Sequence, residues 1–458
     1  MNEEAQSNAD QSGRRVPKPR DNYSQEQYQI LLGCSQKEDV TEWNQWRSQH
    51  RDTRILLEGA ELKGAYLKGA NLENCWLKEA DFREANLQGA NLNESHLESA
   101  HLGGAHLNRA YFYHAYLDGA YLNTADLEGA DLTEASLEGA YLRGANLRNA
   151  NLRASCARRA DLLQSRLEHA NLEDADWRGA DLSNSHLENA HLVRTHLQDA
   201  NLSGAHLQGA DLTRAHLQHA NLIYAHLQNT LIQYTHLERA FLVEAHLENA
   251  RFQQAIVDAS TLIWRCCVNR QSDFRGVGLE SIRIDTGTKQ LLQYNIRRIN
   301  WEDWYQKQHR LVRLAVRQFW QISDYGLSTQ KIINTFFKWT LIFGVIYYVW
   351  GAVDFYLLRV RDYPGIVSDL FVLSGTQEAV SALLVPFRAL YFSVVTMTTL
   401  GFGDMYANAH GFWRGLFGSV LLVLQVILGY VLLGALITRF AVLFTAGGPA
   451  AKFTDEKT

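Results

Sequence analysis

The residues of this sequence best suited to chemistry form the segment Thr399-Leu400-Gly401-Phe402-Gly403. Its two glycines stand in alternate positions, and glycine adopts backbone conformations that other residues rarely reach. Such a segment can point successive carbonyl oxygens in one direction, where they would coordinate a cation that has shed its water. We therefore treat it as a candidate cation site, with Thr396, Thr398 and Asp404 as supporting residues.

Two long apolar segments bracket this site. Residues 339–358 carry a single charge, Asp354, and residues 415–437 carry none. Each is long enough to cross a hydrocarbon layer of about 30 Å as a helix. Between them, Pro386 opens a moderately apolar stretch that is typical of a short helix dipping into the bilayer. Irregular backbone at membrane depth is tolerated only inside protein or along a pore, so the segment indicates a pore.

The candidate site resembles the selectivity filter of potassium channels, T-x-x-T-x-G-(Y/F)-G-D. The motif is matched at Thr396, Thr399, Gly401, Phe402, Gly403 and Asp404. Residues 336–444 as a whole resemble the smallest bacterial two-helix potassium channels, which implies an all-α transmembrane pore domain with a re-entrant pore helix. The resemblance also implies a homotetramer, in which the carbonyls of Thr399, Leu400, Gly401 and Phe402 and the Thr399 hydroxyl replace the hydration shell of K⁺.

Three residues depart from the pattern of potassium channels. Phe402 lacks the tyrosine hydroxyl of many members, Leu400 stands where Val or Ile is usual, and Val395 stands where some members have a buried acid. We expect K⁺ selectivity to survive these changes. Filter stability and inactivation are the properties that they put in question.

Two glycines of the second apolar segment, Gly429 and Gly434, are hinge candidates. In similar channels inner-helix glycines permit bending at the cytosolic gate, and Gly429 is the better placed for that role. Close helix packing is the alternative, because glycine serves it equally well in membranes.

The first two thirds of the chain are dominated by a repeat of five residues. Leucine, with few departures such as Ala157 and Trp177, occupies 42 positions five apart from Leu57 to Leu262, and a small residue stands two positions before each. On a helix successive leucines would be about 140° apart, and in a flat strand they would alternate between faces. Only a chain that turns a corner every five residues keeps all of them in one interior.

This run resembles the pentapeptide-repeat family, whose A-(D/N)-L-x-x units appear here as Ala70-Asn71-Leu72 and Ala125-Asp126-Leu127. The resemblance implies a right-handed quadrilateral β-helix, a solenoid of about ten coils and about 50 Å. A segment with helical spacing that contains Trp43 and Trp46 is expected to cap its first coil. After Leu262 the phase of the repeat breaks.

Histidine precedes the central leucine at intervals of 20 residues, at His186, His206, His226 and His246 and again at His196, His216 and His236. Stacked on one face, such imidazoles would form a metal ladder or a pH sensor, since close imidazoles oppose one another's protonation. The alternative is a polar outward position where His replaces Asp or Asn. We favour this second interpretation, because no carboxylate or cysteine accompanies the histidines at the spacing of a metal site.

The acidic charge of the repeat region and the absence of catalytic motifs argue against several classes of function. Residues 55–255 contain 16 Lys plus Arg and 26 Asp plus Glu. The acidic rod disfavours direct nucleic-acid binding but is compatible with mimicry of DNA towards a protein partner. No phosphate-binding, metalloprotease or nucleophile-elbow motif is present, so we expect no enzyme and no cofactor beyond K⁺ as the permeant ion.

The sequence predicts six parts. They are a disordered tail (1–30), a helical N-terminal cap (31–54), the pentapeptide-repeat β-helix (55–285), a juxtamembrane helical linker (286–331), the transmembrane pore domain (332–445) and a short cytosolic tail (446–458). Nine Lys or Arg between Lys289 and Lys338 place the rod and both termini in the cytosol by the positive-inside rule.

Our principal interpretation is a homotetrameric K⁺ channel of the inner or plasma membrane, whose rod regulates gating or assembly. Its expected partners are K⁺, membrane lipid and an unidentified cytosolic partner or ligand of the rod. The alternative is an interaction protein that binds a cytosolic partner through the rod, with the membrane part as an anchor and the pore non-selective or vestigial.

Overall fold

The computed structural model divides the chain into two compact units, one up to Ile296 and one over Arg297–Ala450. The structure describes residues 22–310, 317, 329–359, 364–365, 367, 370–372, 379–398 and 412–445. The expected disordered tail lies mostly outside these residues, as does the expected C-terminal tail. Each unit is described by itself.

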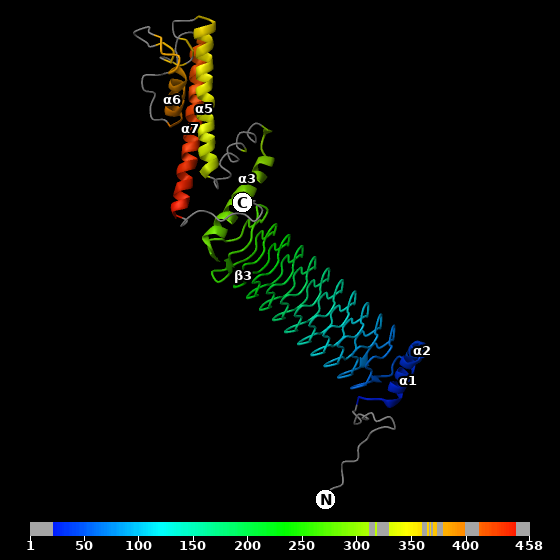
Figure 1. Ribbon diagram of the computed structural model, residues 1–458. Coiled ribbons are helices and arrows are strands. Elements are labelled where there is room, and N and C mark those ends of the chain that lie inside the picture. The colour runs from blue at the N-terminus through cyan, green and yellow to red at the C-terminus, as the bar shows by residue number, and fades with distance from the viewer. Residues whose placement is uncertain are drawn as a thin grey trace. The chain divides into compact units, whose positions relative to one another are not determined.

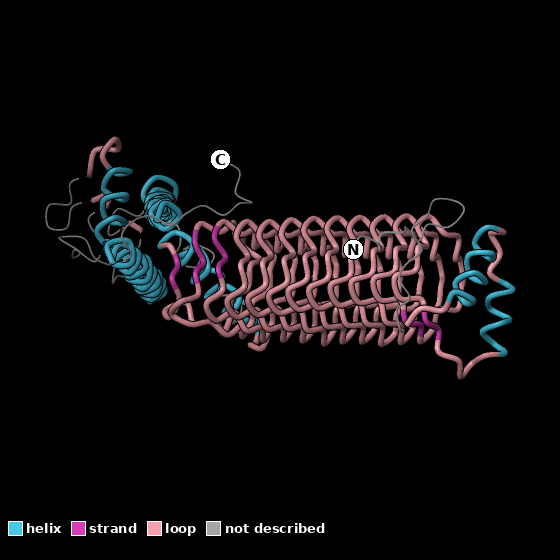
Figure 2. Tube along the Cα trace, turned by 90° about the horizontal axis from the view of Figure 1, so that it is seen from below, coloured by secondary structure: helices cyan, strands magenta, loops and turns pink. Residues whose placement is uncertain are grey.

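Two helices open the first unit, α1 (Gln25–Gln36) and α2 (Thr41–Gln49). Residue 31, the predicted start of the cap, therefore lies inside α1. Trp43 of α2 is fully buried, and its indole Nε1 donates to the carbonyl of Asn71 at 2.8 Å. Arg47 donates through Nη2 to the carbonyl of Glu73 at 2.7 Å. The helices thus satisfy edge carbonyls of the first coils, the role that a solenoid requires of a cap (Figure 2).

The repeat forms a solenoid in which each coil takes 20 residues. Parallel pairings join residues 20 apart, from Glu61 with Asp81 to His236 with Ile256. Leu62 N donates to the carbonyl of Asp81 at 2.8 Å, and Asp81 N donates to the carbonyl of Ala60 at 2.9 Å. The same pattern recurs along the solenoid as far as the pairing of His236 with Ile256. Figure 1 shows the coils stacked on one another. The four-sided coil predicted from the five-residue period is confirmed, whereas its right-handed winding stays a prediction.

The interior of the solenoid consists of the repeated leucines and the small residues before them. Leu67, Leu72 and Ala70 are fully buried, and burial of each leucine contributes roughly 2 kcal/mol. The chain turns at the residue two positions after each leucine, where Asn74 adopts φ +54° and Gly64 adopts φ +66°. This left-handed conformation explains why Gly and Asn are frequent there.

Two departures from the leucine pattern compensate each other. Ala157 and Trp177 occupy the same interior position on adjacent coils, and both are buried. The small residue therefore makes room for the large one. The Trp177 Nε1 donates to the Ser155 hydroxyl at 3.1 Å, so the buried indole N–H is also satisfied.

Short strands mark the two ends of the solenoid. The parallel pair β1 (Ile55–Leu56) and β2 (Cys75–Trp76) lies at the start, and the sheet β3 (Phe241–Val243), β4 (Leu262–Trp264) and β5 (Arg283–Ile284) lies at the end. In this last sheet paired residues are 21 apart, and Ile263 is buried in place of Leu262. The phase therefore changes before Leu262, earlier than the sequence predicted, because the coil already contains an extra residue there. The following helix α3 (Thr286–Gln306) closes the last coil, because Asn295 Nδ2 donates to the carbonyls of Asn269 and Ser272 at 2.8 and 2.9 Å.

The second unit contains two long apolar helices and a short one. Helix α5 (Thr329–Ala352) continues into a π-helical turn (Val353–Leu357), the short helix α6 spans Val385–Thr398, and α7 spans Phe412–Thr445. The most apolar 18 residues within Thr329–Leu357 have a mean hydropathy of 1.5 and those within Leu416–Ile437 one of 2.7, so both helices are long and apolar enough to cross a membrane. The two predicted membrane helices are therefore present, and Figure 1 shows α6 beside α5 and α7.

Candidate ion-conduction site and histidine columns

The structure describes residues up to Thr398 and again from Phe412, and the predicted filter lies in the gap between them. Thr399, Leu400, Gly401, Phe402, Gly403 and Asp404 lie outside the described residues, so their positions remain predictions. Helix α6 ends at Thr398, one residue before the segment. The Thr398 hydroxyl donates to the carbonyl of Val394 at 2.9 Å, and Thr396 is buried.

A buried polar network fixes α6 between the two long helices. The Gln425 amide of α7 donates to the Ser393 carbonyl at 3.0 Å and to the Ser393 hydroxyl at 2.9 Å. Ser393 in turn donates to the carbonyl of Thr340 in α5 at 2.6 Å, and Tyr347 of α5 donates its hydroxyl to the Gln425 carbonyl oxygen. All four residues are buried. Our sequence analysis did not identify this network, although Gln425 is the one amide in the apolar segment 415–437.

The network provides a matched test of how α6 is held. Tyr347→Phe should lower the free energy of unfolding by about 1 kcal/mol, because the buried Gln425 oxygen loses its donor. Tyr348→Phe is the control, since no hydrogen bond joins its hydroxyl to the described residues. Thermal unfolding of the two variants in detergent measures the difference. Equal melting temperatures would show that the network does not stabilise the unit.

The two hinge candidates differ in what surrounds them. A Cβ added at Gly429 would overlap the carbonyl oxygen of Met397 in α6, and the Met397 Cα would lie 3.0 Å from it. A Cβ added at Gly434 would meet nothing within 4 Å among the residues that the structure describes. Close packing therefore accounts for Gly429, whereas at Gly434 an added side chain would meet no such obstacle among the described residues.

Described residues beyond the π-helical turn contact α5 and that turn. Asp354 is buried, and its carboxylate accepts a hydrogen bond from Gly365 N at 2.9 Å. A Cβ at Gly365 would lie 2.9 Å from the Gly351 Cα, so the backbones approach closely there. Asp354, the single charged residue of the first apolar segment, therefore holds the backbone at Gly365 in place.

On the rod, the seven histidines form two stacks. We call His186, His206, His226 and His246 the long histidine column, whose rings stack with centroids 4.6–4.8 Å apart. The short histidine column consists of His196, His216 and His236, with centroids 4.7 and 4.8 Å apart. The stacking predicted from the intervals of 20 residues is confirmed.

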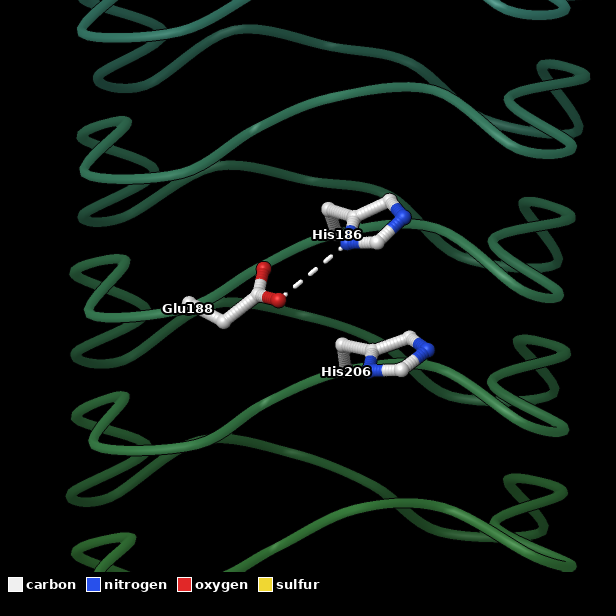
Figure 3. Close-up of side chains that lie close together, drawn as sticks. All are labelled: His186, Glu188 and His206. Atoms are coloured by element: carbon white, nitrogen blue, oxygen red, sulfur yellow. Dashed lines mark hydrogen bonds and ion pairs between the residues drawn. The ribbon is translucent and has the colours of Figure 1, made fainter.

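One premise of the sequence analysis is wrong, because carboxylates and a cysteine do accompany the histidines. Glu188 accepts from His186 Nδ1 at 3.1 Å and lies beside the parallel ring of His206, as Figure 3 shows. Glu238 lies at 3.2 Å from His236 Nδ1. A second group brings together His246, Glu248 and Cys267. At His186, His196, His236 and His246 the side chain two positions later lies beside the ring, a contact that the corner of the coil creates.

Two parts of the chain match known protein families. The family described as pentapeptide repeats matches residues 60–98, 90–129, 125–164, 160–199 and 195–233. Among solved structures, the chain is similar to HetL, a pentapeptide repeat protein involved in heterocyst differentiation regulation from the cyanobacterium Nostoc sp. strain PCC 7120. Identity is 30%, the TM-score is 0.36, and the alignment covers 47% of this chain and 96% of HetL. The chain belongs to the pentapeptide-repeat proteins.

This pentapeptide-repeat protein also carries an ion-channel domain, because the family described as ion channel matches residues 335–446. The two apolar helices and this match make it a membrane protein, and neither family is one of enzymes. Other similar structures are Rfr23 from the cyanobacterium Cyanothece 51142 (40% identity, 22% of this chain, 58% of Rfr23, TM-score 0.12) and QnrB1, a plasmid-mediated fluoroquinolone resistance protein (13%, 42%, 90%, 0.28). No protein of curated function matches the chain significantly.

We expect the short histidine column to make the stability of the pentapeptide-repeat rod depend on pH. Burial, and then the imidazoles of His196 and His236, lower the pKa of His216 below its usual 6.5, while Glu238 opposes the shift. The unfolded chain therefore binds the proton more readily. The contribution of neutral His216 is complete above the unfolded-state pKa and is lost as the pH falls through that value towards the folded-state pKa.

We expect the melting temperature of the rod to fall as the pH drops from about 7.5 to about 5.5. The fall should be smaller in His216→Asn, because asparagine occupies the same repeat position in other coils, as at Asn201. His191→Asn, at a histidine outside both columns, is the control. Identical pH slopes in both variants would contradict a role for the stacked imidazole.

Proposed function

We propose that this protein is a homotetrameric K⁺-selective channel of the inner or plasma membrane. One observation carries the proposal: the short helix α6 lies between two membrane-length helices and ends at Thr398, directly before Thr399-Leu400-Gly401-Phe402-Gly403. The match of residues 335–446 to ion channels supports the same function. In this proposal α6 is the re-entrant pore helix and the segment is the filter.

The order of these elements suits a cation. The carboxyl end of a helix carries a partial negative charge of about half an elementary charge, and that end of α6 leads into the filter. In the proposed tetramer the carbonyls of Thr399, Leu400, Gly401 and Phe402 replace the hydration shell of K⁺. Four chains are required, because one filter strand cannot surround an ion.

The buried network gives α6 the rigidity that a filter support needs. Ser393 lies 5 residues before Thr398 and is bonded to both α5 and α7. Movement of α7 is therefore transmitted to α6 through Gln425 and through the contact between Gly429 and Met397. We infer that the filter and the inner helix move as coupled elements.

The outer surface of the second unit supports assembly within a membrane. Val420, Val423, Leu424 and Ile427 of α7 are each at least half exposed in the single chain. Apolar side chains of this number are unfavourable in water. They suit contact with lipid and with the α7 helices of three further copies.

We propose that the rod lies in the cytosol, as the basic residues before α5 indicate, and that it regulates gating or assembly. Deletion of residues 1–260 should change the open probability or the tetramer yield. An unchanged open probability and unchanged assembly under every stimulus tested would contradict regulation by the rod. The interaction-protein alternative predicts instead that the rod captures its cytosolic partner whether or not the pore conducts.

The primary experiment is reconstitution of the purified full chain in a planar bilayer with K⁺ on one side and Na⁺ on the other. A reversal potential near the K⁺ equilibrium potential, with block by Ba²⁺, is the expected result. A reversal potential near zero would contradict K⁺ selectivity and would make Leu400 and Phe402 the first residues to revert to the common pattern.

A further inference from the structure

The long histidine column ends in a cysteine. Cys267 pairs with His246 in the parallel ladder, so it occupies the outward position that a fifth histidine would take. The interval is 21 residues because an extra residue enters the coil. Cys266 takes the inward position, where its Sγ donates to the carbonyl of Leu242 at 2.7 Å. The two adjacent cysteines therefore point to opposite sides of the coil wall, and only Cys267 joins the column.

Three different metal ligands meet at this end of the column. His246, Glu248 and Cys267 each offer one ligand atom, and the three atoms lie within 4.8 Å of one another. All three side chains are half-buried, so they are screened from bulk water and still accessible to an ion. Imidazole, carboxylate and thiolate are the three groups that bind Zn²⁺ in proteins.

The Glu248 carboxylate lies farther from its histidine than the carboxylates of Glu188 and Glu238 lie from theirs. Its Oε1 lies 3.7 Å from His246 Nδ1, whereas the distances at Glu188–His186 and Glu238–His236 are 3.1 and 3.2 Å. The other oxygen of Glu248 is buried and has no hydrogen-bond partner among the described residues, as is also true of Glu188 and Glu238. A buried carboxylate oxygen in this state is unfavourable unless a donor or a cation meets it.

The charges around the thiol also favour a cation. Glu248 and Glu244 both act electrostatically on Cys267. Glu244 forms an ion pair with Arg265 at 3.2 Å. Among the described residues, Glu248 forms an ion pair only with His246. The group formed by His186, Glu188 and His206 lacks a thiol, and its carboxylate already bonds a ring at 3.1 Å. The end of the column is therefore the stronger of the two groups.

We propose that His246, Glu248 and Cys267 bind a divalent cation of the zinc class. A tetrahedral Zn²⁺ places its ligand atoms about 3.5 Å apart, so the three side chains close on the ion by rotation while the coil stays in place. A water molecule completes the fourth position. Thiolate binding releases the Cys267 proton to solvent, and no redox step is involved.

The proposal is tested with the full chain in detergent, kept reduced by a phosphine, and titrated with Co²⁺ as a spectroscopic substitute for Zn²⁺. One equivalent should produce a thiolate-to-cobalt charge-transfer band in the wild type and in Cys156→Ser. Cys156 is the matched control, because it is half-buried at the same repeat position but stacks between Ser136 and Asp176 instead of a histidine. Cys267→Ser should abolish the band.

Calorimetric titration with Zn²⁺ then measures the other ligands. His246→Asn and Glu248→Gln should each weaken binding at least tenfold, since loss of an outer-shell partner alone costs roughly 10-fold to 100-fold. His186→Asn should leave the affinity unchanged. Circular dichroism of each variant verifies that the solenoid is intact. Persistence of the cobalt band in Cys267→Ser, its loss in Cys156→Ser, or equal Zn²⁺ affinity in His246→Asn and the wild type would overturn the proposal.

Discussion

Replacement of Gly401 by Ala is expected to abolish K⁺ conduction while the protein still inserts and assembles. In the proposed filter Gly401 stands between Leu400 and Phe402, where an added Cβ would restrict the backbone and turn carbonyl oxygens away from the ion. The measurement is the K⁺ current of reconstituted protein, with cross-linking to count the subunits. Among our predictions this one has the largest expected effect, because a single misdirected carbonyl recurs in all four chains.

Leu400→Val is the matched control for that experiment. Valine is usual at this position in similar channels, so the variant should conduct K⁺ with its selectivity retained. Conduction that survives in Gly401→Ala would mean that ions pass elsewhere and that the filter assignment is wrong. Absence of current in both variants and in the wild type would favour the membrane-anchor alternative.

Replacement of Gly429 by Ala is expected to disturb both stability and conduction. The added Cβ would overlap the Met397 carbonyl oxygen, and the contact is with backbone, which cannot move aside as a flexible side chain would. Separation of α7 from α6 should cost about 1–3 kcal/mol, the usual cost of overpacking a closely packed interior. Thermal unfolding in detergent and single-channel recording measure the two effects.

Gly434→Ala is the internal control, because no described part of the chain lies within 4 Å of the added Cβ. Its melting temperature should equal or slightly exceed that of the wild type, since alanine stabilises a helix relative to glycine by up to about 1 kcal/mol. If Gly434 is a hinge, its open probability should change while its stability does not. Equal destabilisation of both variants would show that packing against Met397 is not what requires Gly429.

The sequence alone was sufficient to predict the solenoid. Each coil contacts mainly the coils before and after it, so the five-residue period determines the interior, the four corners and the stacking of residues 20 apart. The same locality explains why the histidine columns were predictable. The lengths of the apolar segments likewise predicted the two membrane helices, because any helix that crosses a bilayer must span the same hydrocarbon thickness.

Contacts between residues far apart in the chain were decided only by the tertiary structure. The bonds from Gln425 to Ser393 and from Tyr347 to Gln425 join residues 32 and 78 positions apart, and no periodic pattern relates them. Glycine at 429 was ambiguous in sequence because a hinge and a close contact both require the absence of a side chain. Its distance to Met397 distinguishes the two.

At the C-terminal end of the rod, too, the sequence predicted some features and only the tertiary structure decided others. The repeat determined where a histidine must point, but the extra residue near Cys267 changed the phase, and only the folded coil shows which of two adjacent cysteines faces outward. Asn295 caps the last coil through carbonyls 23 and 26 residues earlier. A period extends only as far as its repeats, so the ends of a solenoid and the groups gathered there depend on three-dimensional contacts.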